Sequence, residues 1–233
     1  MKRHLDGWIG WRFFFISFVA TLTCACATIP FPASSEYNPP SGRGPIVILL
    51  SGHSGPADYR SYAAEVGRLG YYAVLLDGQE YYKSGSGHLR RTIEQAQRSP
   101  KALPGKAAVI GFSMGGGATL KHAAFMPDLV SAVVTYYPKT NELGNMRSLA
   151  AQFQIPTLVL AGEKDTYHNC CLIESMRAME AGAKEGGKPF ELVVYPNAHH
   201  GFNLATRRGY RDKDAADAWQ RTIKMLSQYQ PLR

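Results

Sequence analysis

Ser113 stands at the centre of Gly111-Phe112-Ser113-Met114-Gly115, which has the pattern G-x-S-x-G. An uncharged apolar run, 107–110, precedes the pattern, and helical spacing over 114–125 follows it. A serine on a sharp turn from strand to helix projects its hydroxyl above a sheet, and flanking glycines avoid clashes with the packed elements. The pattern therefore predicts a nucleophilic serine; the alternative is an ordinary glycine-rich turn.

Asp165 is the candidate carboxylate that would orient a histidine beside this serine. It follows the apolar run 157–160, in the segment Ala161-Gly162-Glu163-Lys164-Asp165. An aspartate in a serine relay holds the imidazole in one tautomer and stabilises its charged form. Glu163 is the alternative acid, and a solvated loop carboxylate is the plain alternative for Asp165.

His199 and His200 follow the apolar run 190–195. A histidine on this loop could take the serine proton as general base. Adjacent loop residues usually point in different directions, so only one of the two can serve. The chain order serine, aspartate, histidine is that of α/β-hydrolases and differs from the order in other serine-triad folds.

Two backbone amides are candidates to stabilise a developing oxyanion. Met114 N–H lies at the start of the helix that follows the serine. The second amide is expected from the loop Ser51-Gly52-His53-Ser54-Gly55, which follows the apolar run 46–50. We expect His53 N–H to be this donor, with Ser54 N–H as the alternative; the other possibility is a structural glycine turn without such a role.

Cys170 and Cys171 are adjacent, and the only other cysteines, Cys24 and Cys26, lie near the N-terminus. A bridge between neighbouring cysteines closes an eight-membered ring that strains the peptide, so we expect two buried thiols and no disulfide. Two thiols are too few to ligate zinc. No carboxylate cluster accompanies His199 and His200 at metal-binding spacing, so neither a metal nor a cofactor is expected.

The apolar runs are continuous rather than alternating, which indicates strands covered on both faces. Their alternation with helical patterns indicates parallel crossovers. We predict the α/β class: an α/β-hydrolase fold with one doubly wound, mostly parallel sheet of about six strands and helices on both faces, with the chemistry beyond the carboxyl ends of the strands. The expected strands are 46–50, 72–76, 107–110, 129–136, 157–160 and 190–195, and the expected helices are 57–69, 86–98, 114–125, 172–185 and 213–228.

The N-terminus has the pattern of an export signal. Basic residues (Lys2, Arg3 and Arg12) precede the apolar run 13–22, and Ala25-Cys26-Ala27 supplies small residues at a cleavage site. The run is shorter than the about 20 residues that cross a bilayer. We expect a signal peptide over 1–27 and an exported protein, periplasmic or secreted. The alternatives are an uncleaved membrane anchor and lipid attachment at Cys26 or Cys24.

The remainder divides into an irregular, Pro- and Ser-rich lead-in, 28–44, and one domain, 45–233. The chain has 233 residues, 45% of them hydrophobic and 19% charged, which excludes a disordered or multi-pass membrane protein. The net charge of +8 is spread thinly, so we expect no nucleic-acid partner, and association with a membrane only through lipidation or an uncleaved signal. The oligomeric state cannot be read from the sequence.

Four segments resemble the dienelactone hydrolase family of the α/β-hydrolases, and the resemblance covers roughly 44–229. They are GFSMGGG (111–117), AGEKD (161–165), YPNAHHGF (195–202) and AADAWQRTIKML (215–226). The resemblance implies that Asp165 is the acid, that His200 rather than His199 is the base, and that no large lid covers the site.

The chain departs from the family's pattern at two places. Dienelactone hydrolases proper have cysteine where this chain has Ser113, and serine members of the wider family are carboxylesterases and related acyl hydrolases. The family's His-Gly dipeptide reads Ser51-Gly52 here. The arginines with which the family binds a substrate carboxylate have no clear counterparts in this chain either. Arg207 and Arg208 are expected on the solvated surface.

The function predicted from the sequence is hydrolysis of a small-molecule carboxylic ester through an acyl-enzyme on Ser113, with His200 as general base and Asp165 as orienting acid. One alternative is an exported peptidase or amidase on the same scaffold. Another is a non-catalytic binding protein. Tyr81 and Tyr82 either line a pocket or pack in the core.

Overall fold

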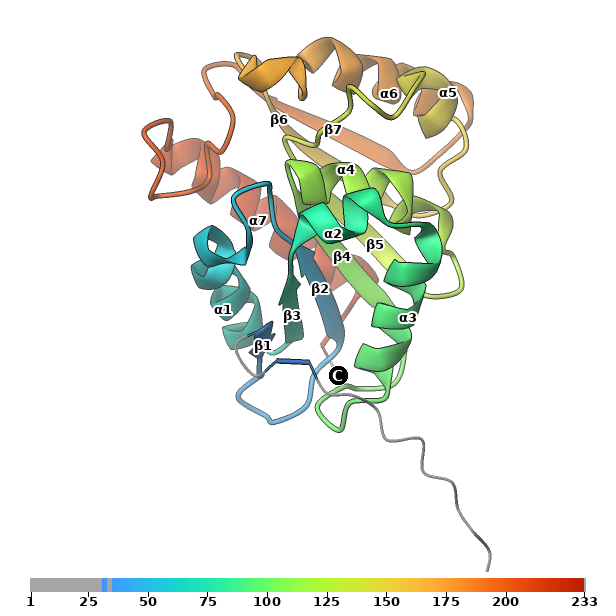
Figure 1. Cartoon of the computed structure of the whole chain (residues 1–233), viewed down its shortest axis with the longest axis vertical. Helices are drawn as coiled ribbons and strands as arrows, with labels where there is room; N and C mark the ends of the chain where they lie inside the picture. The colour runs from blue at the N-terminus through green and yellow to red at the C-terminus, as the bar shows by residue number, and fades with distance from the viewer. Residues whose placement is uncertain (1–30, 33–34, 233) are drawn as a thin grey trace, which may run out of the picture.

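The computed structural model describes residues 31–32 and 35–232, and within them one seven-stranded sheet runs in the order β1-β3-β2-β4-β5-β6-β7 (Figure 1). The predicted signal peptide, 1–27, lies outside the described residues. Neighbouring strands pair in parallel, except that β1 pairs antiparallel with β3. The strands are β1 (Glu36–Tyr37), β2 (Ile46–Leu50), β3 (Tyr72–Leu76), β4 (Ala107–Phe112), β5 (Val130–Tyr136), β6 (Thr157–Gly162) and β7 (Phe190–Tyr195).

The six predicted strands are present, and the prediction of a mostly parallel sheet is confirmed. β2 is buried along its whole length because helices cover both faces of the sheet. β1 was not predicted, since two residues are too short to show a period. β4 and β6 each extend two residues beyond the predicted ends, to Phe112 and Gly162.

Helices cover both faces, as predicted. The side chains of Val47 and Leu49 pack in one core with those of α1 and α7, whereas Ile48 and Leu50 pack in the opposite core with α2 and α3. A third cluster joins β6 to α4, α5 and α6. The helices are α1 (Arg60–Arg68), α2 (Gly78–Lys83), α3 (Ser86–Gln97), α4 (Met114–Lys121), α5 (Met146–Ala150), α6 (Ile173–Glu185) and α7 (Asp212–Tyr229).

Two of these helices, α2 and α5, were not predicted, and both are short. Helix α2 contains Tyr81 and Tyr82, which are buried in the core rather than lining a pocket. No helix among residues 31–32 and 35–232 is both long and apolar enough to cross a membrane.

The glycines around Ser113 permit an unusually close approach between the start of α4 and the neighbouring strands. A Cβ atom on Gly115 would lie 2.2 Å from the carbonyl oxygen of Leu50, and one on Gly111 would lie 2.4 Å from that of Gly115. The amide of Gly115 also donates to the carbonyl of Ser51 (3.1 Å). Any larger residue would push α4 away from the end of β2, and Ser113 would move with it.

Replacing Gly115 by alanine should therefore reduce the free energy of unfolding by about 1–3 kcal/mol, the usual cost of overpacking a tight core. Gly87→Ala is the matched control, because Gly87 is exposed in α3 and a Cβ there would meet only the flexible end of Arg91. The control should be neutral or stabilising by up to about 1 kcal/mol, since alanine favours helix. Urea unfolding measures both; equal stabilities of the two variants would contradict the close approach.

His122, at the carboxyl end of α4, is 6% exposed. Burial, and next the charge of Lys121, lower the pKa of this imidazole. The unfolded chain therefore binds more protons than the folded chain below about pH 6.5, so the unfolding free energy should fall as the pH drops through that region.

Urea unfolding between about pH 8 and pH 5 measures this dependence. His122→Gln should flatten it, because glutamine does not titrate. Identical slopes in wild type and His122→Gln would show that burial of His122 has no linkage to folding.

Candidate active site

Ser113 occupies the turn between β4 and α4 in a strained conformation, with φ 51° and ψ −110°. Its amide donates to the carbonyl of Tyr136 (3.0 Å), and its own carbonyl accepts from the amides of Gly117 (2.9 Å) and Lys139 (2.8 Å). A non-glycine residue in such a conformation costs of order 1–3 kcal/mol and persists only where its surroundings fix it. These three backbone bonds fix it here, with the side chain directed out of the end of the sheet.

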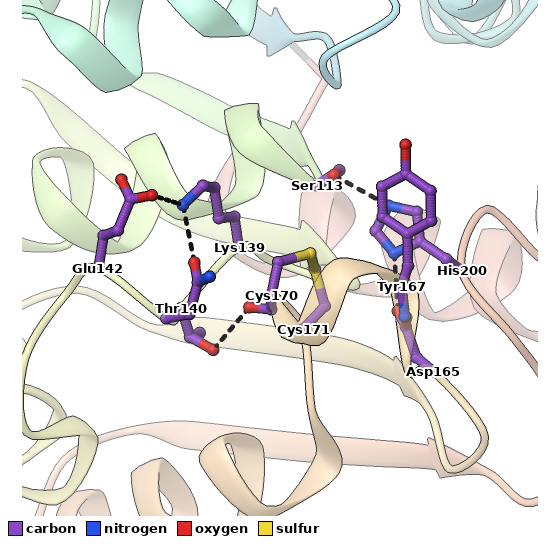
Figure 2. Close-up of a disulfide and its surroundings, with 10 residues drawn as sticks. Ser113, Lys139, Thr140, Glu142, Asp165, Tyr167, Cys170, Cys171 and His200 are labelled. Carbon is purple, nitrogen blue, oxygen red and sulfur yellow. Dashed lines mark hydrogen bonds and ion pairs between the residues drawn. A yellow bond between two sulfur atoms is a disulfide. The ribbon is translucent and has the colours of Figure 1, made fainter.

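The structure brings Ser113, Asp165 and His200 together, as the sequence predicted (Figure 2). The Ser113 Oγ is 2.9 Å from His200 Nε2, and His200 Nδ1 is 2.7 Å from Asp165 Oδ2. A carboxylate can only accept, so Nδ1–H donates to Asp165 and Nε2 is free to accept from the serine. The second oxygen of Asp165 accepts from the amide of Tyr167 (3.1 Å), which fixes the carboxylate in turn.

The two competing residues lie away from this chain of hydrogen bonds. Glu163 forms an ion pair with Arg177 (2.8 Å) at the surface. The side chain of His199 is exposed, whereas Asp165 is 2% exposed and Ser113 6%. The geometry therefore selects Asp165 and His200 from the alternatives that the sequence left open.

Two tyrosines that the sequence analysis missed flank the imidazole of His200. The ring of Tyr167 stacks on it, with centroids 4.4 Å apart and planes 11° apart. The ring of Tyr137 meets it edge-on at 4.6 Å. Both residues follow strands, Tyr137 directly after β5 and Tyr167 in the loop after β6, so their position was a usable signal. Burial raises the pKa of Tyr137 well above its ordinary value, and its neutral hydroxyl donates to Asn203 Oδ1 (2.7 Å).

The two predicted oxyanion donors, the amides of Met114 and His53, belong to residues that line a cavity beside Ser113. Within the described part of the chain, neither the amide of Met114 nor that of His53 makes a hydrogen bond, whereas the amide of Gly115 is used by Ser51. His53, Met114 and Ser113 line the same cavity. Ser54 lines only the second cavity beside Ser113, and its amide is also without a hydrogen bond among the described residues, so it stays the alternative donor.

Two cavities adjoin Ser113. One has a volume of about 260 Å³, and its lining includes His53, Met114, Lys139, Tyr167, His168 and Cys170. The other has a volume of about 160 Å³, and its lining includes His53, Tyr59, Tyr137, His200, Leu204 and Arg207. Both volumes lie below the roughly 300–1,000 Å³ of sites for drug-sized ligands.

Arg207 belongs to the smaller cavity and forms an ion pair with Asp58. Its side chain is 47% exposed, so the predicted surface position is correct, although the residue also borders the site. Arg208 is exposed, as predicted.

The prediction of two free thiols is wrong, because Cys170 and Cys171 form a disulfide. The preceding His168 and Asn169 adopt left-handed conformations (φ 47° and 50°), and they turn the chain tightly into the pair. The carbonyl of Cys170 accepts from the amide (2.7 Å) and the hydroxyl (3.1 Å) of Thr140, so the surrounding fold fixes the backbone that the small ring requires. The predicted burial is correct: Cys170 is 6% exposed and Cys171 1%.

The two sulfur atoms and a ring nitrogen of His200 lie within 4.8 Å of one another. Metal ligation by cysteine requires the thiolate, and sulfur atoms joined in a disulfide do not supply one. In the oxidised form, this cluster therefore lacks the donors of a metal site.

The family model described as "Dienelactone hydrolase family" matches residues 75–230. A protein of Salmonella typhimurium named "Putative carboxymethylenebutenolidase" is 33% identical over 126 residues, which are 52% of this chain and 46% of the relative. Its namesake from Escherichia coli K12 is 32% identical over 126 residues, with 52% and 45% covered. The chain thus spans about half the length of these curated relatives.

Solved structures share the fold. A "putative dienelactone hydrolase" of Klebsiella pneumoniae superposes with a TM-score of 0.70 at 24% identity, covering 81% of this chain and 88% of the other. Esterase 2 of Thermogutta terrifontis superposes with a TM-score of 0.65 at 17% identity, covering 85% and 90%. At these identities the likeness shows the α/β-hydrolase fold alone. The family model, which matches well over half of the chain, shows that the protein belongs to the dienelactone hydrolase family.

Proposed function

We propose that the protein is a serine hydrolase that cleaves carboxylic esters of small molecules through an acyl-enzyme on Ser113. The observation that carries this proposal is the unbroken hydrogen-bonded chain from Ser113 Oγ through His200 to Asp165. Membership of a hydrolase family agrees with it, as does the esterase among the structural neighbours.

In the first half-reaction, His200 Nε2 takes the proton of Ser113 Oγ as this oxygen attacks the acyl carbon. Asp165 stabilises the imidazolium that results. The tetrahedral intermediate collapses when the imidazolium gives its proton to the alcohol oxygen, the carbon–oxygen bond of the ester breaks and the alcohol leaves. A water molecule then attacks the acyl-serine, with the same histidine as base, and releases the carboxylic acid.

In the proposed reaction, the amides of Met114 and His53 stabilise the negative charge that develops on the carbonyl oxygen. Each is free of partners within the described residues, and each borders the cavity beside Ser113. Donors held in place before the reaction stabilise the oxyanion without a cost of reorganisation. No step of this mechanism requires a metal or a cofactor.

We also propose that the protein is exported. The basic residues and apolar run of the predicted signal support this, and the Cys170–Cys171 disulfide is typical of an oxidising compartment. Intact mass spectrometry of the protein from a bacterial host should show a mature N-terminus at Thr28. A lipidated N-terminal Cys24 or Cys26 would show lipoprotein processing instead, and an unprocessed N-terminus would show an uncleaved anchor.

The proposed triad predicts that Ser113→Ala and Asp165→Asn each lower kcat for p-nitrophenyl acetate by several orders of magnitude, because removal of one member disables the relay. Glu163→Gln is the matched control. Its side chain lies at the surface beside Arg177, so this variant should change kcat by no more than about twofold.

A fluorophosphonate probe gives a second readout, since it labels only an activated serine. Wild type should be labelled at Ser113, and Asp165→Asn much more slowly. A protein that resists the probe and hydrolyses no ester would be a binding protein of hydrolase fold, which would end the enzymatic proposal.

A further inference from the structure

Different groups of the proposed catalytic site line the two cavities beside Ser113. The smaller cavity is lined by His200, together with Tyr59, Tyr137 and Leu204. The larger cavity is lined by Met114 and Cys170; His200 is not among its lining residues, although one of its ring nitrogens lies within 4.8 Å of both sulfur atoms of the disulfide. Ser113, His53 and Tyr167 border both, so a substrate bound across the serine would place one group in each cavity.

The chemistry of ester cleavage assigns these groups. His200 must deliver its proton to the alcohol oxygen, so the alcohol must lie on the side where His200 Nε2 is accessible. The carbonyl oxygen must face the amides of Met114 and His53. The remaining substituent of the carbonyl carbon is the acyl chain, and with the alcohol on the side that His200 lines, the larger cavity is the space left for this chain.

The Cys170–Cys171 disulfide stands at this larger cavity. Figure 2 shows the bridge between Lys139 on one side and the stacked rings of Tyr167 and His200 on the other. Cys170 lines the cavity, and Cys171 behind it is 1% exposed. Two hydrogen bonds from Thr140 to the Cys170 carbonyl tie this wall to the loop that follows β5.

Lys139 contributes the one charged side chain among the residues that line this cavity, and that charge is compensated within the protein. Its ammonium group pairs with Glu142, donates to Asn141 Oδ1 (2.7 Å) and lies 5.0 Å from the centre of the Tyr82 ring. An acyl group that carried its own carboxylate would compete with Glu142 and Asn141 for this ammonium group. The lining therefore suits an uncharged group.

We propose that the cavity between Met114 and the Cys170–Cys171 disulfide is the acyl pocket, and that the disulfide restricts it to short, uncharged, apolar acyl groups. The inference rests on the proposed ester hydrolysis and names its substrate class. The bridge thus determines specificity, and it does not take part in the bond-making steps.

The test compares kcat/KM for p-nitrophenyl acetate, butyrate and octanoate, so that the alcohol stays constant. In wild type, the octanoate should be hydrolysed at least about tenfold less efficiently than the better short ester, since a few methylenes that do not fit a pocket cost this much. In Cys170→Ala/Cys171→Ala, the wall is smaller and no longer cross-linked. The octanoate-to-butyrate ratio should rise at least about fivefold, chiefly through a lower KM for octanoate.

Leu204→Ala is the matched control, because Leu204 is buried and lines the other cavity. This variant should shift the preference among acetate esters of methanol, butanol and p-nitrophenol, and leave the octanoate-to-butyrate ratio at the wild-type value. Circular dichroism checks that the variants are folded. If the double variant does not fold, wild type is tested after a phosphine has reduced the disulfide. Alkylation followed by peptide mass mapping then verifies that Cys170 and Cys171 have become thiols.

The outcomes separate the two proposals. If wild type hydrolyses none of these esters, the proposed function fails. If wild type hydrolyses them, but the octanoate-to-butyrate ratio of kcat/KM is the same in wild type, in the protein without the disulfide and in Leu204→Ala, the proposed ester hydrolysis stands. The assignment of the acyl pocket is then wrong. A preference for a p-nitrophenyl monosuccinate over the butyrate would overturn the uncharged substrate class and show that Lys139 selects a carboxylate.

Discussion

The imidazole of His200 is held by four residues from three separate segments, and the rest of the site is arranged around it. Asp165 accepts a hydrogen bond from Nδ1 of the ring, and Ser113 Oγ is hydrogen-bonded to Nε2. Tyr167 covers one face, and Tyr137 closes against the ring from another direction. An imidazole bound in this way has little freedom to rotate, so the proton path from serine to aspartate is set before any substrate binds.

These segments meet because of the order of the strands. β4, β5, β6 and β7 are consecutive neighbours in the sheet and run in parallel, so their carboxyl ends lie side by side. The chain leaves β4 at Ser113, β5 at Tyr137, β6 before Asp165 and β7 before His200. Each loop needs only to present one side chain toward the same edge. The glycine-dependent approach of α4 to β2 then sets the height of the serine above the sheet.

The convergence of the strand ends also explains which residues of the site could be predicted from the sequence. Ser113 could be predicted because it stands in a G-x-S-x-G pattern after an apolar strand, and the other two strands narrowed the acid and the base to loop residues. The resemblance to the family then chose Asp165, and His200 over His199. Tyr137 and Tyr167 also follow strands, but a tyrosine has many ordinary uses, and ring stacking depends on loop conformations that periodicity does not encode. The disulfide was missed for a related reason: its ring is tolerated only because His168 and Asn169 take left-handed conformations and Thr140 holds the Cys170 carbonyl.

The charges near the site are paired within the protein, and this pairing suits the proposed reaction. Arg207 pairs with Asp58 and Lys139 with Glu142, so each of these cations has an anionic partner within the protein. Burial raises the pKa of Tyr137, which lies against the imidazole, and that of Tyr59, which lines the same cavity as His200, so neither hydroxyl adds a charge to the site. The charges that develop during ester cleavage, an imidazolium and an oxyanion, would therefore meet Asp165 and the free amides rather than competing ions. An environment of fixed dipoles around a transient charge pair is what electrostatic stabilisation of a transition state requires.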